Sequence, residues 1–203
     1  MKRIAVLSSG RGSNFQAIVD AILAGTVPAA CVALITDNPG CYAAVRAGRA
    51  GIPVTAIDYR AFPTKEAYEA ALMTEMEAWN PDLFVLAGYM RILGREIVRR
   101  FPGRIINIHP ALLPSFPGLH AQRQAIEWGV RCSGCTVHFV DEEMDEGPII
   151  LQSCVPVREG DSEAGLSDRI LVQEHRCLPE AIRLFCEGRL RIEGRRVRIL
   201  DGP

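Results

Sequence analysis

The feature that most restricts the fold is a regular alternation of short apolar segments with helix-like segments over roughly the first half of the chain. Apolar runs bounded by turn residues are typical of buried strands, and apolar residues recurring every three or four positions are typical of helices. This alternation predicts a parallel sheet built from right-handed crossovers. We expect strands at 3–8, 30–36, 54–57, 83–87 and 104–109, and helices at 15–23, 41–48, 65–80 and 94–101.

The pattern changes after Gly118. We expect helices at 121–128 and 162–188, an antiparallel strand pair at 136–140 and 149–156, and a terminal hairpin over 191–199. Pro179 should interrupt the long helix. No linker, repeat or low-complexity segment divides the chain. We therefore predict a single domain over 1–203, of the α/β class. It should be a Rossmann-like three-layer sandwich with a mostly parallel central sheet and antiparallel strands in its C-terminal half.

Composition excludes several classes of function. The 203 residues are 48% hydrophobic and 23% charged, which is typical of a packed globular protein, and the formal net charge is −1. Such a charge balance does not indicate a nucleic-acid or membrane surface, and no apolar run is long enough to cross a bilayer. The first apolar run ends at Ser8-Ser9-Gly10 without a cleavage-site pattern, so we interpret it as a strand and not as a signal peptide. Seven cysteines, an odd number, favour a reducing cytoplasm over a disulfide scaffold.

A C-x-x-C sequence, Cys132 to Cys135, precedes His138. A zinc site needs a second pair of ligands at a matching distance, and Cys154, Cys177 and His175 do not form one. A redox C-x-x-C opens a helix, whereas this one precedes strand-like residues. We therefore expect no metal, and a structural or incidental role for both cysteines.

The loop Gly10-Arg11-Gly12-Ser13-Asn14 lies between the first strand and the first helix. Backbone N–H groups at a helix start bind anions, with help from the helix dipole. Phe15 replaces the third glycine of a dinucleotide fingerprint, and a Walker lysine is missing, so the loop suits one phosphate monoester. A tight turn in which Ser13 or Asn14 caps the helix explains the same residues.

Asn107 and His109 lie two residues apart where an apolar strand meets a loop with three prolines and a glycine. Side chains two apart on a strand face the same side, so an amide donor and an imidazole face one volume. The alternative is that Asn107 caps the turn and His109 is a core histidine. Ligands of open α/β sheets bind beyond the carboxyl ends of strands, where Gly10–Asn14 and Gly88–Leu93 are also expected, and this favours a site. A carboxylate from the acidic loop 141–146 could hold His109, although composition does not identify which one.

Four motifs together resemble the phosphoribosylglycinamide formyltransferases, the folate-dependent enzymes of purine synthesis. The resemblance extends from Lys2 to about Arg191. The motifs are Gly10–Asn14 (GRGSN), Ala87–Leu93 (AGYMRIL), Asn107–Pro114 (NIHPALLP), and Val137–Ile150 with its HFV and DEGPII segments.

The resemblance implies roles for particular residues. The catalytic trio would be Asn107, His109 and Asp145. Glycinamide ribonucleotide would be bound by Gly12, Ser13, Asn14 and Glu174. The co-substrate 10-formyltetrahydrofolate would be bound by Lys65, Met90, Arg91, Ile92, Leu93, Asn107, Val140, Asp141 and Asp145. Lys65 stands where arginine is frequent, Ala111 where serine is common and Ser115 where lysine is common, so details of substrate contact differ.

The same resemblance implies a mechanism and partners. The amine of the ribonucleotide would attack the formyl carbon directly. Asn107 and a protonated His109 would stabilise the oxyanion, and Asp145 would hold His109 and a water that carries the proton. No metal is implied. The partners are the two small-molecule substrates, without nucleic acid or membrane, and the protein would be a cytoplasmic monomer or homodimer.

Three rivals stay open. A formyltetrahydrofolate hydrolase uses the same trio and usually carries an N-terminal regulatory domain, whereas the first strand here begins at residue 3. Initiator-tRNA formyltransferase adds a C-terminal RNA-binding domain, and this chain ends at Pro203 without a basic extension. A non-catalytic nucleotide-binding module explains the glycine loop but not the trio.

Overall fold

The computed structural model describes residues 1–202. It divides into two compact units, Met1–Ile106 and the residues from Asn107 onward. The expected single domain stays a prediction, and each unit is described separately below. No helix within residues 1–202 is long and apolar enough to span a membrane.

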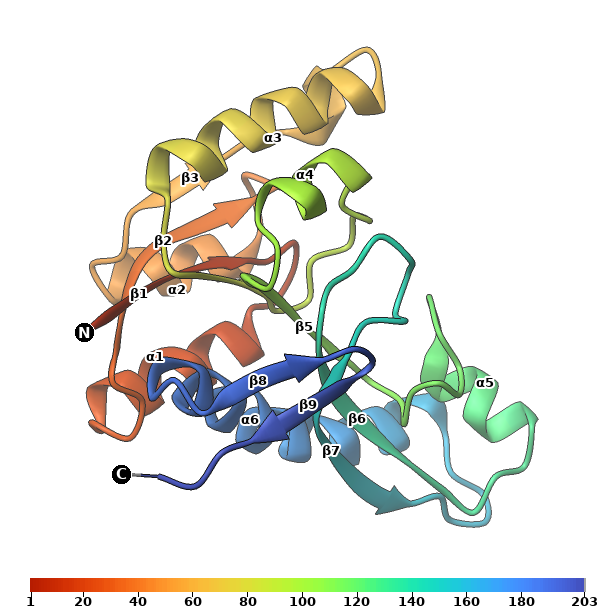
Figure 1. Ribbon diagram of the computed structural model, residues 1–203. Coiled ribbons are helices and arrows are strands. Elements are labelled where there is room, and N and C mark those ends of the chain that lie inside the picture. Colours follow the sequence, from red (N-terminus) through yellow and green to blue (C-terminus); the bar gives the residue numbers. More distant parts are fainter. Residues whose placement is uncertain (203) are drawn as a thin grey trace. The chain divides into compact units, whose positions relative to one another are not determined.

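The first unit is an α/β unit with parallel strands. Its strand order is β3-β2-β1-β4, and β1–β2, β1–β4 and β2–β3 all pair in parallel. Figure 1 shows α1 and α2 on one side of these strands and α3 and α4 on the other. The elements are β1 (Lys2–Leu7), α1 (Ser13–Leu23), β2 (Ala29–Thr36), α2 (Tyr42–Arg49), β3 (Val54–Ala56), a 3-10 turn (Tyr59–Ala61), α3 (Lys65–Trp79), β4 (Leu83–Leu86) and α4 (Arg95–Arg100).

Strands β1 and β4 form the core of this unit. Every residue from Ile4 to Leu7 and from Leu83 to Val85 is fully buried, as expected for strands covered by helices on both faces. The chain runs from β1 outward to β3 and then returns to the other side of β1 with β4. The loops after β1 and β4 therefore lie together at a switch point. Ser9 N–H donates to the Gly88 carbonyl oxygen at 3.0 Å, and Met90 N–H donates to Ser9 Oγ at 2.9 Å.

The second unit contains an antiparallel strand pair and the longest helix. Strand β5 (Ile105–His109) passes from the first unit into the second, and β6 (Cys132–Phe139) pairs antiparallel with β7 (Ile149–Pro156). Strands β8 (Leu190–Glu193) and β9 (Arg196–Ile199) form an antiparallel hairpin, and β9 pairs in parallel with β7. Helix α5 (Ala121–Glu127) precedes β6, and α6 (Glu163–Cys186) packs on β6 and β7.

The topology confirms the predicted fold class, with parallel strands first and antiparallel strands in the C-terminal half. Two local predictions were wrong. Helix α6 continues through Pro179, because packing of the buried face around Leu178, Pro179 and Ile182 offsets the missing backbone N–H. Strand β6 begins at Cys132, so the C-x-x-C lies within the strand and does not precede it.

Candidate active site

His109 is the last residue of β5, and its side chain is only 6% exposed. One ring nitrogen, Nε2, lies 2.8 Å from the Phe116 carbonyl oxygen. A carbonyl only accepts hydrogen bonds, so Nε2 carries a proton and donates it. The other nitrogen, Nδ1, lies 3.4 Å from Asp145 Oδ2. Nδ1 is therefore the nitrogen at which His109 can exchange a proton.

Among the five carboxylates of its loop, Asp145 places Oδ2 at 3.4 Å from His109 Nδ1. Its backbone is left-handed, with φ of 57°, a conformation that Asp tolerates better than most residues. Asp145 Oδ2 also accepts a hydrogen bond from Gly118 N–H at 2.8 Å, which ties this loop to the loop after β5. Gly147 closes the turn where a Cβ would lie 1.8 Å from the Phe139 carbonyl oxygen. The backbone geometry of this loop therefore directs the Asp145 carboxylate toward His109.

His138 lies in one of the four family motifs, but the sequence analysis assigned it no role in the site. It lies on β6, is 2% exposed and lies close to two members of the trio, Asn107 and Asp145. Its Nε2 lies 3.2 Å from Asn107 Nδ2 and 3.7 Å from Asp145 Oδ1. Burial lowers the pKa of His138 below its ordinary value, against smaller opposing effects of the Phe139 carbonyl and Asp145. The structure thus brings Asn107, His109 and Asp145 into one cluster with His138 between Asn107 and Asp145.

The Gly10–Asn14 loop leads into α1 as expected, but neither Ser13 nor Asn14 caps the helix. Gly12 is the N-cap residue, and no side chain forms a cap hydrogen bond. Gly12 has φ of 68°, and a Cβ there would lie 2.7 Å from Ala43 Cβ, so only glycine fits. Arg46 Nε donates to the Arg11 carbonyl oxygen at 2.9 Å and fixes the loop from α2. The result is a rigid helix start whose backbone N–H groups can bind an anion.

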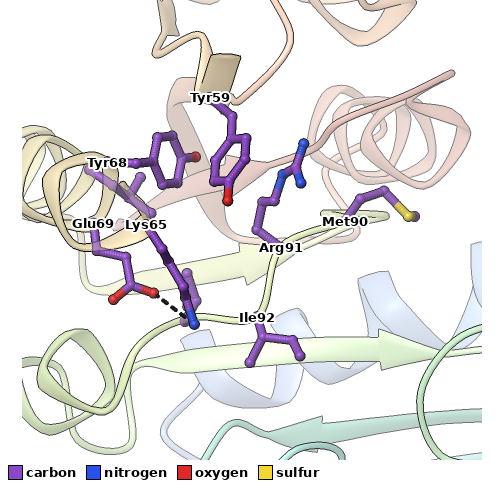
Figure 2. Close-up of a pocket in the computed structure, with 9 residues that line it drawn as sticks. Tyr59, Lys65, Tyr68, Glu69, Met90, Arg91 and Ile92 are labelled. Carbon is purple, nitrogen blue, oxygen red and sulfur yellow. Dashed lines mark ion pairs between the residues drawn. The ribbon is translucent and has the colours of Figure 1, made fainter. Parts of the chain in front are cut away.

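A pocket of about 210 Å³ lies in the first unit. Figure 2 shows Lys65 and Glu69 pointing toward one another, and their ion pair measures 3.4 Å from Nζ to Oε1. The Arg91 guanidinium stacks on the Tyr59 ring, 3.8 Å from its centroid. The structure therefore brings Lys65 and the Met90–Leu93 segment to one cavity. Its lining residues are Tyr59, Lys65, Tyr68, Glu69, Leu72, Met90, Arg91, Ile92 and Leu93.

Hydrogen bonds and an ion pair hold several of the residues that line this pocket. Arg91 Nε donates to Asp37 Oδ2 at 2.8 Å, and the Asp37 side chain is 3% exposed. The Tyr68 and Tyr89 hydroxyl groups hydrogen-bond to each other. Burial raises the pKa of Tyr68 to about 12, so this hydroxyl stays protonated at neutral pH. Arg91 is thus held by a buried carboxylate on one side and an aromatic face on the other.

The remaining predicted site residues lie in the second unit. Val140 and Asp141 directly follow β6, at the start of the loop that carries Asp145. Glu174 lies near the middle of α6, and its side chain is buried. Lys65 and Met90–Leu93 belong to the first unit.

The cysteines of the C-x-x-C do not form a ligand pair. Cys132 is exposed and Cys135 is buried, because residues three apart on a strand face opposite sides. Within residues 1–202, no three His, Cys, Asp or Glu side chains are grouped so that they could hold a metal ion.

Comparison with known proteins gives the family. The model of the family described as formyl transferase matches residues 2–182. This chain belongs to the formyl transferase family. Within it, the phosphoribosylglycinamide formyltransferase of Escherichia coli is 44% identical over 93% of this chain and 89% of its own length.

Solved structures of the family agree with this assignment. Glycinamide ribonucleotide transformylase 1 from Symbiobacterium toebii is 55% identical, with a TM-score of 0.96 over 99% of this chain and 95% of that one. A formyltetrahydrofolate deformylase from Pseudomonas syringae is 27% identical, with a TM-score of 0.91 over 98% of this chain and 66% of that one. The chain spans only 14% of the trifunctional purine biosynthetic proteins of two Drosophila species, which are 47% and 48% identical to it.

Proposed function

We propose that this protein transfers the formyl group of 10-formyltetrahydrofolate to the primary amine of glycinamide ribonucleotide, a step of purine biosynthesis. The observation that carries the proposal is the pair formed by the buried His109 and Asp145, 3.4 Å apart, in a chain of the formyl transferase family. The identities of 44% to the Escherichia coli phosphoribosylglycinamide formyltransferase and 55% to the Symbiobacterium toebii transformylase support the choice of substrates.

The chemistry follows from the three side chains. The folate supplies the formyl carbon that the amine attacks. Asn107 Nδ2 donates a hydrogen bond to the formyl oxygen as negative charge develops there, and a protonated His109 stabilises the same charge. Asp145 holds His109 and a water that carries the amine proton to the leaving nitrogen. The limited exposure of His109 and Asp145, 6% and 12%, supports this role because charges act more strongly where bulk water is excluded.

Two other regions bind the substrates in this proposal. The start of α1 binds the phosphate of the ribonucleotide through Gly12, Ser13 and Asn14, and Glu174 contacts the same substrate. The first-unit pocket of about 210 Å³ is smaller than the roughly 300–1,000 Å³ that encloses a drug-sized ligand. It therefore holds only part of the folate. Lys65 and Arg91 suit its acidic tail, although each is already paired with a carboxylate.

The remaining folate-binding predictions belong to the same proposal. In the first unit, Met90, Ile92 and Leu93 offer apolar contacts to the flat pteridine ring. In the second unit, Val140 and Asp141 stay predicted folate-binding residues on the basis of the family motif. A monomer or homodimer in a reducing cytoplasm, acting on small molecules alone, stays a prediction.

The rival activity is hydrolysis of the formyl group to formate by the same trio. The 27% identity to the Pseudomonas syringae deformylase is lower than the 44% identity to the Escherichia coli formyltransferase, which favours transfer. The two activities give different products from the same folate. Hydrolysis releases formate without any amine acceptor, whereas transfer consumes glycinamide ribonucleotide.

The experiment is a product assay with both substrates and with the folate alone. We expect formylated ribonucleotide with both and negligible formate with the folate alone. The Asn107→Ala and His109→Ala variants should lose on the order of 10²-fold or more in kcat, as when an oxyanion donor is removed. Ser13→Ala should weaken ribonucleotide binding in a titration and leave folate binding unchanged. Formate as the main product would reject transfer, and normal kcat in both alanine variants would reject the trio.

A further inference from the structure

We infer that His138 is a positioning residue, which in its neutral form accepts a hydrogen bond from Asn107 and fixes the direction in which the Asn107 amide faces. The inference rests on the proposed role of Asn107 as the donor to the formyl oxygen. His138 itself does not touch the reacting atoms.

The partner of Nδ1 decides the tautomer of His138. Nδ1 lies 2.9 Å from the Phe139 carbonyl oxygen, which only accepts hydrogen bonds, so Nδ1 carries the proton. In the neutral ring Nε2 then presents a lone pair. Nε2 lies 3.2 Å from Asn107 Nδ2, so its lone pair can accept a hydrogen bond from that amide. The tautomer is therefore fixed by the backbone of the next residue and not by the substrate.

The lone pair decides the orientation of the Asn107 amide. If the amide turned over, Asn107 Oδ1 would face the Nε2 lone pair, and two acceptors would oppose each other. With Nδ2 toward His138, one of its two N–H groups is used and the other is left to donate elsewhere. Asn107 is half-buried, so that second donor can meet a ligand. An oriented donor stabilises developing charge without reorganisation during the reaction.

Protonation of His138 would reverse this arrangement. Nε2 would become a donor and would no longer accept from Asn107. The positive charge of the ring would instead attract Asp145 Oδ1, 3.7 Å from Nε2. Asp145 also faces His109 through Oδ2, so both imidazoles would compete for one carboxylate. The charged or titratable groups that act on His138 are Asp145, His109 and Asp141. Burial of the ring to 2% exposure keeps it neutral against the two carboxylates.

Two substitutions separate the two hydrogen bonds of His138. Asn at position 138 can replace Nδ1 and donate to the Phe139 carbonyl, but it places nothing where Nε2 was. Gln at position 138 can place its amide oxygen where Nε2 was and accept from Asn107, but it loses the donor to Phe139. Positioning of Asn107 predicts that His138→Gln keeps more activity than His138→Asn. A role limited to tying down Phe139 predicts the reverse order.

We expect kcat of His138→Asn to fall on the order of 10-fold or more, a fraction of the loss when an oxyanion donor is removed. His138→Gln should recover most of that loss, and KM for both substrates should stay unchanged in both variants. In an Asn107→Ala background the difference between the two variants should vanish, because Asn107 is then absent. Equal kcat values in the parent background, or a higher kcat for His138→Asn, would overturn the inference.

A spectroscopic measurement tests the inference independently of activity. At about pH 7, nitrogen-15 spectra of the unmodified protein should show His138 as the neutral tautomer with its proton on Nδ1. A proton on Nε2, or an imidazolium ring, would refute the inference even if both variants failed to fold. For the kcat measurements the matched control is His120→Asn, which changes an exposed histidine at the start of α5 and should leave kcat unchanged. Absence of formyl transfer by the parent protein would reject the proposed function and leave the tautomer result standing.

Discussion

Replacing Asp145 by asparagine removes the charge that faces His109 and keeps the shape of the side chain. The amide oxygen of the new residue can still accept from Gly118 N–H, which Asp145 Oδ2 now does at 2.8 Å. The two loops should therefore stay tied together. The contact with His109 Nδ1, 3.4 Å from Asp145 Oδ2, loses its charge, and so does the longer contact of 3.7 Å between Asp145 Oδ1 and His138 Nε2.

The size of the effect follows from that distance. Two unit charges 3.4 Å apart attract by about 5 kcal/mol at an effective dielectric constant of about 20. This figure is an upper bound, because both groups were desolvated on folding. A hydrogen bond to a charged group contributes about 1.5–3 kcal/mol net. If that amount is lost from the transition state, kcat falls about 10- to 150-fold.

The assay is the initial rate of formyl transfer with both substrates saturating, followed by the absorbance of the folate product. Glu146→Gln is the matched control, since it removes a carboxylate from the neighbouring exposed position of the same loop. Both variants should remain folded at the assay temperature, which circular dichroism checks. An Asp145→Asn enzyme with the kcat of the parent would show that the carboxylate charge does not support His109.

Two further predictions concern stability. Hydrogen bonds from Arg169 at 2.8 and 3.0 Å lower the pKa of Asp161 from its usual 3.8 to about 2. The ionised Asp161 therefore stabilises the folded protein above pH 3.8, and this stabilisation is lost as the pH falls toward 2. Asp161→Asn should lower the urea midpoint at neutral pH, and the difference from the parent should shrink over that acid range; a constant difference would contradict the assignment. Gly12→Ala should destabilise the protein by at least about 1–2 kcal/mol, the cost of a left-handed residue with a Cβ, because its new Cβ would also meet Ala43 at 2.7 Å. Gly10→Ala, where a Cβ meets nothing within 4 Å, is the control in the same thermal-unfolding measurement.

The sequence predicted the elements well where local pattern and burial agree. The parallel strands of the first unit, the antiparallel β6–β7 pair and the terminal hairpin are confirmed by the strand pairing. Pro179 was misread because a local rule does not include the packing of α6 on two strands. The start of β6 was misread because Cys132, Ser133 and Gly134 have weak strand preference, and only their pairing with β7 makes them a strand.

The site was less predictable than the fold, for a physical reason. Which carboxylate faces His109 depends on the left-handed backbone at Asp145 and on its bond to Gly118 N–H, neither of which has a sequence pattern. The role of His138 depends on which ring nitrogen meets a carbonyl. The presence of both side chains was visible in the sequence, but their hydrogen-bond partners were not.

The alternation of side chains along β6 also determines how the chain will respond to thiol reagents. Cys132 and Cys154 are both exposed, and they lie diagonally across the β6–β7 ladder, since Cys132 pairs with Pro156 and Gly134 with Cys154. Cys135 faces the opposite side and is fully buried. A maleimide dye should therefore label Cys132 and Cys154 in the folded protein and reach Cys135 only after the strand separates. Labelling of Cys132 would then report on the surface of the folded protein, and labelling of Cys135 would report on the opening of the core.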